Sequence, residues 1–141
     1  MILKSRLGLA ALGLALSLGS AIATADVVAI VSSASPITAV TKDQMADIFM
    51  GKIHRLPNGA AAVPIDQIEG SGAREEFYTK VVGKSVAQMK AYWSKIIFTG
   101  RGLPPKEMPT SEDVKQLVVS NPAAIGYIDE KLVDSSVRVL L

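Results

Sequence analysis

The chain has 141 residues, of which 49% are hydrophobic and 5% aromatic, and this length fits one domain and leaves little room for two. It has no cysteine, which excludes thiol catalysis, thiolate metal sites and disulfide bonds. The 15 Lys and Arg residues exceed the 13 Asp and Glu residues, so the formal net charge is +2.

Residues 1–25 have the three parts of a secretory signal peptide. Lys4 and Arg6 form a cationic start, and Ala23-Thr24-Ala25 fits a signal-peptidase site. The apolar stretch between them, about 17 residues, is at the low limit for crossing a bilayer, so a retained membrane anchor is the weaker alternative. We expect cleavage before Asp26, a periplasmic mature protein, and no stable membrane insertion after cleavage.

Removal of that segment leaves a neutral chain. Both Lys4 and Arg6 lie in it and no acid precedes Asp26, so 13 cations and 13 anions remain in 116 residues (141 − 25). A neutral chain lacks the broad positive surface that nucleic-acid binding requires. We therefore expect one domain over residues 26–141 and no nucleic-acid partner.

Short β-type runs alternate with helical patterns after residue 26, which indicates a layered α/β or α+β fold. Apolar, β-branched runs predict strands at residues 26–32, 61–66, 124–128 and 137–141. Turn-forming residues predict loops at 33–40 and 52–60. Residues 99–109 contain two Gly and three Pro, and we expect no regular element there.

Capping patterns and apolar spacing predict four helices, which begin at Thr41, Ser71, Ser85 and Ser111. Thr41 with Gln44, and Ser85 with Gln88, have the spacing of a capping box. Gly51 and Gly83 are the predicted stops of the first two helices.

Apolar residues indicate which side of each helix is buried. In the helix of residues 71–82 we expect Phe77, Val81 and Ala73 to face the core. In the helix that Ser85 opens, the predicted apolar stripe consists of Met89, Tyr92, Trp93, Ile96 and Ile97.

The sharpest local signal is the strand-loop-helix junction of residues 66–74. Gly70 and Gly72 let the backbone turn tightly and approach a ligand, and Ser71 can cap the helix or donate its hydroxyl. The unpaired N–H groups of a first helical turn, at the positive end of the helix dipole, suit an anion. Arg74 adds a planar fork of donors. Together these residues predict oxyanion recognition.

A purely structural interpretation of this junction remains open. Ser71 then only caps the helix, the two glycines only turn, and Arg74 pairs with a surface acid such as Glu75. Glu75 and Glu76 favour a helix start but repel an anion unless they point away. Arg101, in a Gly-rich loop, either closes over a bound anion or belongs to an ordinary exposed turn.

No catalytic or metal site is predicted. His54 is the only histidine, without carboxylate or cysteine companions in the sequence, and no Ser/His/acid set or carboxylate pair stands out. Binding is therefore favoured over catalysis, and we expect no enzyme activity, cofactor or metal.

Three stretches, residues 45–52, 69–77 and 121–128, resemble in order and spacing the phosphate-binding component of phosphate ABC transporters. That component is a periplasmic binding protein of the type II fold, with a ligand between two lobes. The resemblance implies that residues 26–141 form a single lobe, an α/β fold with a central mixed sheet flanked by helices.

The resemblance also implies a ligand site at the Gly-Ser-Gly helix start, made of Glu69, Gly70, Ser71, Gly72, Ala73 and Arg74. Ala73 replaces the usual Thr and Gln67 replaces a usual Arg, so two donors are missing and binding should be weakened.

Two functions follow from this resemblance. The first is a secreted, non-catalytic protein that binds phosphate or a similar oxyanion for phosphate ABC transport, with an ABC permease or a second lobe from another chain as partner. The alternative is a protein-interaction or sensory module that has kept the lobe fold without the ligand.

Overall fold

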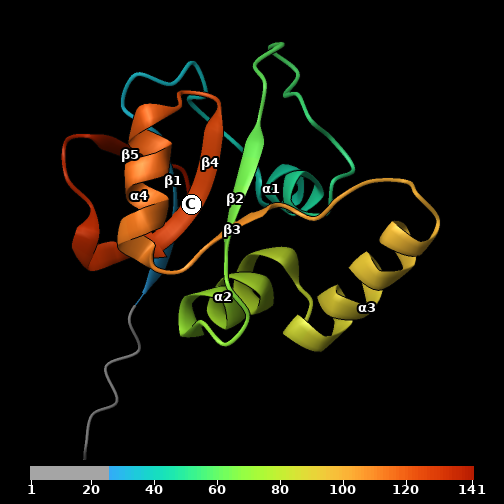
Figure 1. The fold of residues 1–141 in the computed structure, drawn as a ribbon. Helices are drawn as coiled ribbons and strands as arrows, with labels where there is room; N and C mark the ends of the chain where they lie inside the picture. The colour runs from blue at the N-terminus through green and yellow to red at the C-terminus, as the bar shows by residue number, and fades with distance from the viewer. Residues whose placement is uncertain (1–25) are drawn as a thin grey trace, which may run out of the picture.

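A five-stranded mixed sheet forms the centre of residues 26–141, the part of the chain that the computed structural model describes (Figure 1). The predicted signal peptide and its cleavage lie outside the described residues. The strands are β1 (Val27–Ser32), β2 (Val63–Gln67), β3 (Lys106–Met108), β4 (Ala124–Asp129) and β5 (Val137–Val139). Their order in the sheet is β3-β2-β4-β1-β5.

The sheet combines parallel and antiparallel pairs. β2 runs parallel to both β3 and β4, whereas β1 runs antiparallel to both β4 and β5. The carboxyl ends of β2, β3 and β4 therefore meet at one edge of the sheet.

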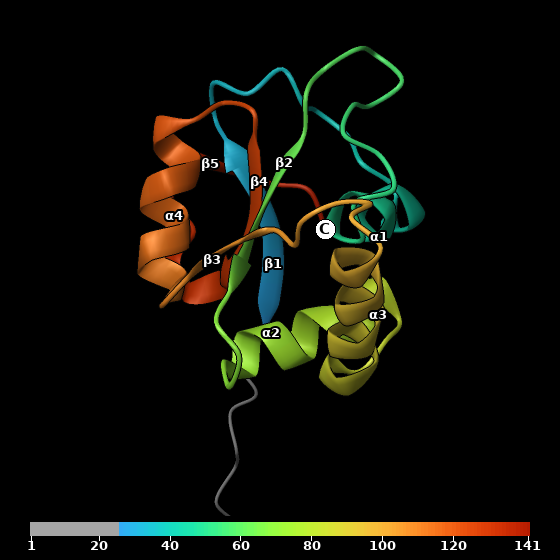
Figure 2. The ribbon, with the colours of Figure 1, turned by 45° about the vertical axis from the view of Figure 1, so that its right-hand side comes forward.

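Helices cover both faces of the sheet (Figure 2). The α-helices are α1 (Lys42–Phe49), α2 (Gly72–Phe77), α3 (Val86–Phe98) and α4 (Ser111–Ser120). α4 lies on one face, α1 and α2 lie on the other, and α3 packs outside them (Figures 1 and 2). None of the described helices is long and apolar enough to cross a membrane.

Alternation along the strands divides the core between the two faces. Ala29 and Val31 of β1 pack in the cluster under α1, α2 and α3, whereas Ile30 packs in the cluster under α4. Side chains of successive strand residues point to opposite faces, so a strand buried on both sides is continuously apolar.

The predicted helix boundaries are largely confirmed. Thr41 and Ser85 each close a capping box with the glutamine three residues later. Gly51 and Gly83 follow their helices with φ of 69° and 74°, the left-handed conformation that glycine adopts without a steric cost.

The absence of regular structure predicted for residues 99–109 is wrong at β3. Ile65 of β2 pairs in parallel with Lys106, and the ladder continues to Met108. Pro104 and Pro105 precede the three paired residues and Pro109 follows them, so no missing proline N–H falls within the ladder. β3 is also an edge strand, which tolerates prolines at its ends.

The predicted helix of residues 71–82 is not a single α-helix. α2 ends at Phe77, and a π-helix continues through Tyr78–Val82, with the Gly83 N–H donating to the Tyr78 carbonyl at 2.7 Å. The wider π turn shifts the buried position by one residue, so Val82 is buried and Val81 only half-buried. Phe77 is buried as predicted, and Ala73 is half-buried.

The predicted apolar stripe of α3 is correct only in part. Met89 and Trp93 are buried and Tyr92 and Ile96 are half-buried, but Ile97 is 51% exposed. The last turn of α3 extends beyond the core.

Gly126 of β4 permits the close packing of α4 on the sheet. A Cβ atom added there would lie 2.5 Å from Val114 Cγ1 and 3.2 Å from Val118 Cγ2. We expect Gly126→Ala to lower the free energy of unfolding in urea by about 1–3 kcal/mol, the usual cost of overpacking. Gly72→Ala is the matched control, because a Cβ at Gly72 meets nothing within 4 Å. Equal stability of the two variants would contradict this packing.

Candidate functional site

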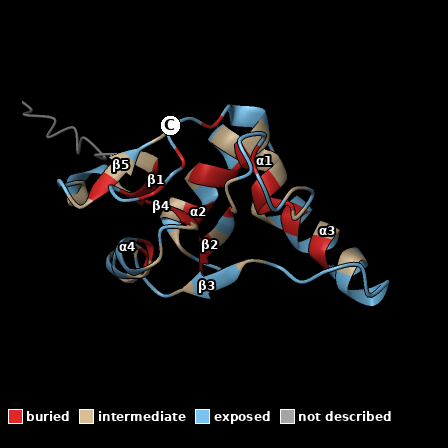
Figure 3. Cartoon of the chain, turned by 90° about the horizontal axis from the view of Figure 1, so that it is seen from above, coloured by how far each residue is buried: buried red, intermediate tan, exposed pale blue. Residues whose placement is uncertain are grey.

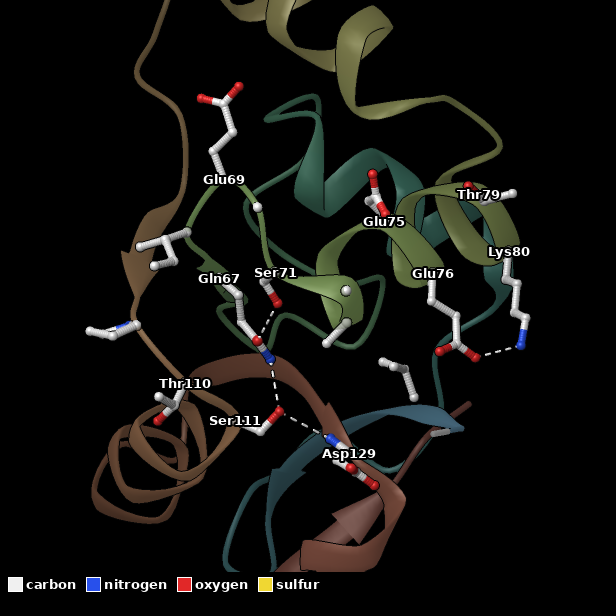
Figure 4. A pocket seen from close by; sticks show the side chains of 16 residues that line it. Gln67, Glu69, Ser71, Glu75, Glu76, Thr79, Lys80, Thr110, Ser111 and Asp129 are labelled. Carbon is white, nitrogen blue, oxygen red and sulfur yellow. Dashed lines mark hydrogen bonds and ion pairs between the residues drawn. The ribbon is translucent and has the colours of Figure 1, made fainter. Parts of the chain in front are cut away.

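An open pocket of about 1130 Å³ lies at the carboxyl ends of the parallel strands (Figure 4). Its walls come from the loop after β2, the start of α4 and Asp129 at the end of β4. α2 follows β2 and α4 follows β3 on the opposite face of the sheet (Figure 2). Open α/β sheets bind ligands outside the carboxyl ends of their strands, at the point where the helices that follow two strands lie on opposite faces of the sheet.

Five of the six residues predicted for the ligand site line this pocket, namely Glu69, Gly70, Ser71, Gly72 and Ala73. Gly70 has a φ of 91°, a conformation that L side chains rarely adopt, so the tight turn requires glycine here. Ser71 is the N-cap of α2, and its Oγ accepts from the Arg74 N–H at 3.4 Å.

Arg74 does not reach the pocket. Its Nη1 donates to the Gln67 carbonyl at 2.7 Å and to Glu107 Oε1 of β3 at 3.0 Å, and the residue is only 8% exposed. Arg74 shares the inner face of its helix with Phe77 and Tyr78, three and four residues later. The predicted guanidinium fork for an anion is therefore turned into the protein, and its acidic partner is Glu107, not Glu75.

Beneath Arg74 lies a buried cluster that the sequence did not reveal. The carboxylate of Asp66 accepts hydrogen bonds from the hydroxyls of Tyr78 and Tyr127 and from the Gln67 N–H. Burial raises the pKa of Asp66, although both tyrosine hydroxyls and the charge of Arg74 act in the opposite direction. Burial and the neighbouring Asp66 also raise the pKa values of both tyrosines, which keeps their hydroxyls protonated donors.

Gln67 links the starts of α2 and α4 across the pocket (Figure 4). Its Oε1 accepts from the Ser71 hydroxyl at 2.8 Å, and its Nε2 donates to Ser111 Oγ at 3.1 Å and to the Tyr127 carbonyl at 3.0 Å. We call these contacts the Gln67 bridge. The sequence indicates Gln67 only as the replacement of a usual arginine and gives no sign of its contact with Ser111, because nothing local relates two serines so far apart in the chain.

Backbone donors at the two helix starts remain unpaired. Within residues 26–141, the N–H groups of Gly72, Ala73 and Ser111 have no hydrogen-bond acceptor. The first N–H groups of a helix point outward along its axis, at the positive end of its dipole. Two helices thus present donors to one pocket.

The charged side chains of the pocket are mainly acidic. Glu69, Glu75, Glu76 and Asp129 line it, and Lys80, the one lining cation among the described residues, lies 2.5 Å from Glu76 Oε1. Glu69 pairs with Lys90 at 3.3 Å. Figure 4 shows Glu69 and Glu75 directed away from the Gln67 bridge. Across the described chain, no three potential metal ligands form a cluster.

Searches of protein-family models and of curated proteins give no match. Among solved structures, the chain is similar to a protein from Clostridium perfringens described as a phosphate ABC transporter substrate-binding protein with bound phosphate. The TM-score is 0.62 at 28% identity, over 81% of this chain and 43% of that protein. The chain resembles one lobe of a phosphate ABC transporter substrate-binding protein. This finding confirms the predicted resemblance and the predicted α/β lobe.

Two further substrate-binding lobes have the same fold. An ABC-type phosphate transport receptor from Vibrio cholerae gives a TM-score of 0.62 at 22% identity, over 81% of this chain and 44% of the receptor. PstS from Borrelia burgdorferi gives 0.58 at 16% identity, over 81% and 46%. The chain thus spans less than half the length of the proteins it matches. These two similarities show the fold alone.

The burial of Arg74 predicts a structural role for it. We expect Arg74→Ala to lower the free energy of unfolding by about 1.5–3 kcal/mol without any ligand, the range for hydrogen bonds to charged groups. Lys80→Ala removes an exposed ion pair and should change stability little. Urea denaturation of both variants tests this, and an Arg74→Ala protein as stable as the unchanged chain would contradict it.

The raised pKa of Asp66 predicts how stability depends on pH. The folded state holds the Asp66 proton more tightly than the unfolded state, so this group's contribution to stability falls as pH rises above 3.8 toward its folded pKa. Asp66→Asn has no titrating group at this position, so its stability lacks this dependence on pH. The variant also loses one hydrogen-bond acceptor and should therefore be less stable than the unchanged protein. The deficit should be largest at low pH and should shrink as pH rises through that window. Urea denaturation over this pH range tests it, and a deficit that grows with pH would show a lowered pKa.

Proposed function

We propose that the pocket between the starts of α2 and α4 binds phosphate or a similar tetrahedral oxyanion. The main support is the convergence of unpaired N–H groups from Gly72, Ala73 and Ser111 on one pocket. Helix starts bind oxyanions through such groups because they combine directed donors with a favourable dipole. The bound phosphate of the similar Clostridium perfringens protein supports this choice of ligand.

The Ser111 hydroxyl is placed to add a donor. Its Oγ accepts from Gln67 Nε2 at 3.1 Å and from the Asp129 N–H at 3.2 Å, which occupies both lone pairs. Its own proton has no acceptor in the described part of the chain. The Ser71 proton, in contrast, already goes to Gln67 Oε1. An incoming oxyanion therefore meets a Ser111 hydroxyl that can only donate.

The binding that we propose is weak. Neutral donors must offset the desolvation of the anion, because Arg74 is turned inward and Lys80 is paired with Glu76. The pocket is also open to solvent on one side. A second lobe from another chain would close it, and we propose such a lobe or an ABC permease as partner, outside the cytoplasm.

The inward position of Arg74 and the acids around the pocket favour one other function, a protein-interaction or sensory module without a small ligand. In that case a periplasmic extract yields a stable protein partner, and Arg74→Lys, which keeps the charge, leaves this binding intact.

Calorimetric titration of the purified protein with phosphate and with sulfate tests the proposed site. We expect heat at millimolar phosphate and about tenfold weaker binding by Ser111→Ala, as the loss of one hydrogen bond to a charged ligand implies. Ser120→Ala, at the other end of α4, is the matched control and should bind as the unchanged protein does. If neither anion gives heat, the proposal fails and the interaction module remains.

A further inference from the structure

The end of α3 and the loop after it form the most exposed apolar part of residues 26–141. Phe98 is 92% exposed, Leu103 82% and Ile97 51%, more than any other large hydrophobic residue described. We call residues 95–106 the α3 tip. Figure 3 shows this end of α3 reaching away from the sheet with exposed residues on its surface.

The charges on the α3 tip are all positive. No acidic residue occurs from Phe77 to Lys106, although residues 26–141 as a whole are neutral. Lys95, Arg101 and Lys106 are exposed, and none of them forms an ion pair within the described residues. Residues 95–106 therefore carry three unpaired cations and three exposed apolar side chains.

The exposed apolar side chains of the tip lie outside the core. Trp93 is the last buried residue of α3, and Gly100 turns the chain with a φ of 67° immediately after the helix. The tip contributes no residue to the proposed phosphate pocket. Substitutions at Phe98 or Leu103 should leave both the fold and that pocket unchanged.

We propose that the α3 tip docks on an anionic lipid surface. Phe98 and Leu103 enter the boundary between headgroups and acyl chains, while Lys95, Arg101 and Lys106 lie near the lipid phosphates. A projecting helix end can enter a flat lipid boundary without a matching groove, and apolar burial combined with anionic lipid attraction gives reversible binding. Pairing of two tips in a symmetric dimer would place like charges together, so a second copy is the poorer fit.

Sedimentation with lipid vesicles tests this docking. We expect the protein to bind vesicles of phosphatidylglycerol and phosphatidylcholine in equal parts, to bind pure phosphatidylcholine much less, and to dissociate as salt is raised. Phe98→Ser should lower partitioning about tenfold, and Arg101→Gln about fivefold. Val119→Ser is the matched control, because Val119 is 41% exposed on α4, on the opposite side of the molecule (Figures 1 and 2). All variants are prepared in the same way as the unchanged protein, so differences between them report on the tip.

Equal binding to the two kinds of vesicle, or a Phe98→Ser variant that binds as well as the unchanged protein, would overturn the proposal. Two further measurements test other partners of the tip: light scattering detects a dimer, and capture by the immobilised protein detects a protein partner. A dimer that Phe98→Ser abolishes would assign the tip to a second copy, and tip-dependent capture of an acidic protein without vesicle binding would assign it to that protein. Each outcome is independent of the phosphate titration.

Discussion

Two buried residues at the carboxyl end of β2, Asp66 and Gln67, fix the geometry of the site by hydrogen bonds to different partners. Asp66 collects hydroxyl donors from Tyr78 and Tyr127, and Gln67 connects the starts of α2 and α4. A buried carboxylate without donors would be very costly, so the Asp66 cluster fixes the helix that carries Ser71 relative to β4. The pocket therefore depends on a network that lies mostly beneath it.

That network also explains why Arg74 supplies no cation to the pocket. The Arg74 guanidinium lies under the loop, where it donates to the Gln67 carbonyl and to Glu107 and favours the nearby charge of Asp66. Because the guanidinium is hydrogen-bonded to β2 and β3, it connects the start of α2 to the sheet and cannot also face a ligand. The junction of residues 66–74 keeps its turn and its N–H groups, while its arginine stabilises the fold.

Short sequence patterns predicted correctly those features that depend on neighbouring residues alone. The serine cap and the left-handed Gly70 follow from residues within one turn of each other, and both are present. The prediction that Arg74 faces the ligand was wrong. It relied on the anion-binding chemistry of arginine, whereas the spacing of three and four residues from Phe77 and Tyr78 indicates the buried face of the helix. The Gln67 to Ser111 contact and the parallel pairing of β3 join segments far apart in the chain, so no local pattern could predict them.

The two proposed binding surfaces rest on opposite electrostatic arrangements. In the pocket, directed N–H groups and one hydroxyl face the ligand while acids surround it, so recognition depends on geometry at short range and on partial charges. At the α3 tip, full positive charges on long side chains occur together with exposed apolar groups. Attraction to an anionic partner is therefore long-range and does not depend on a precise geometry. A small, discrete anion suits the first arrangement, whereas an extended anionic surface suits the second. The two proposed surfaces therefore use different residues for two kinds of phosphate-bearing partner.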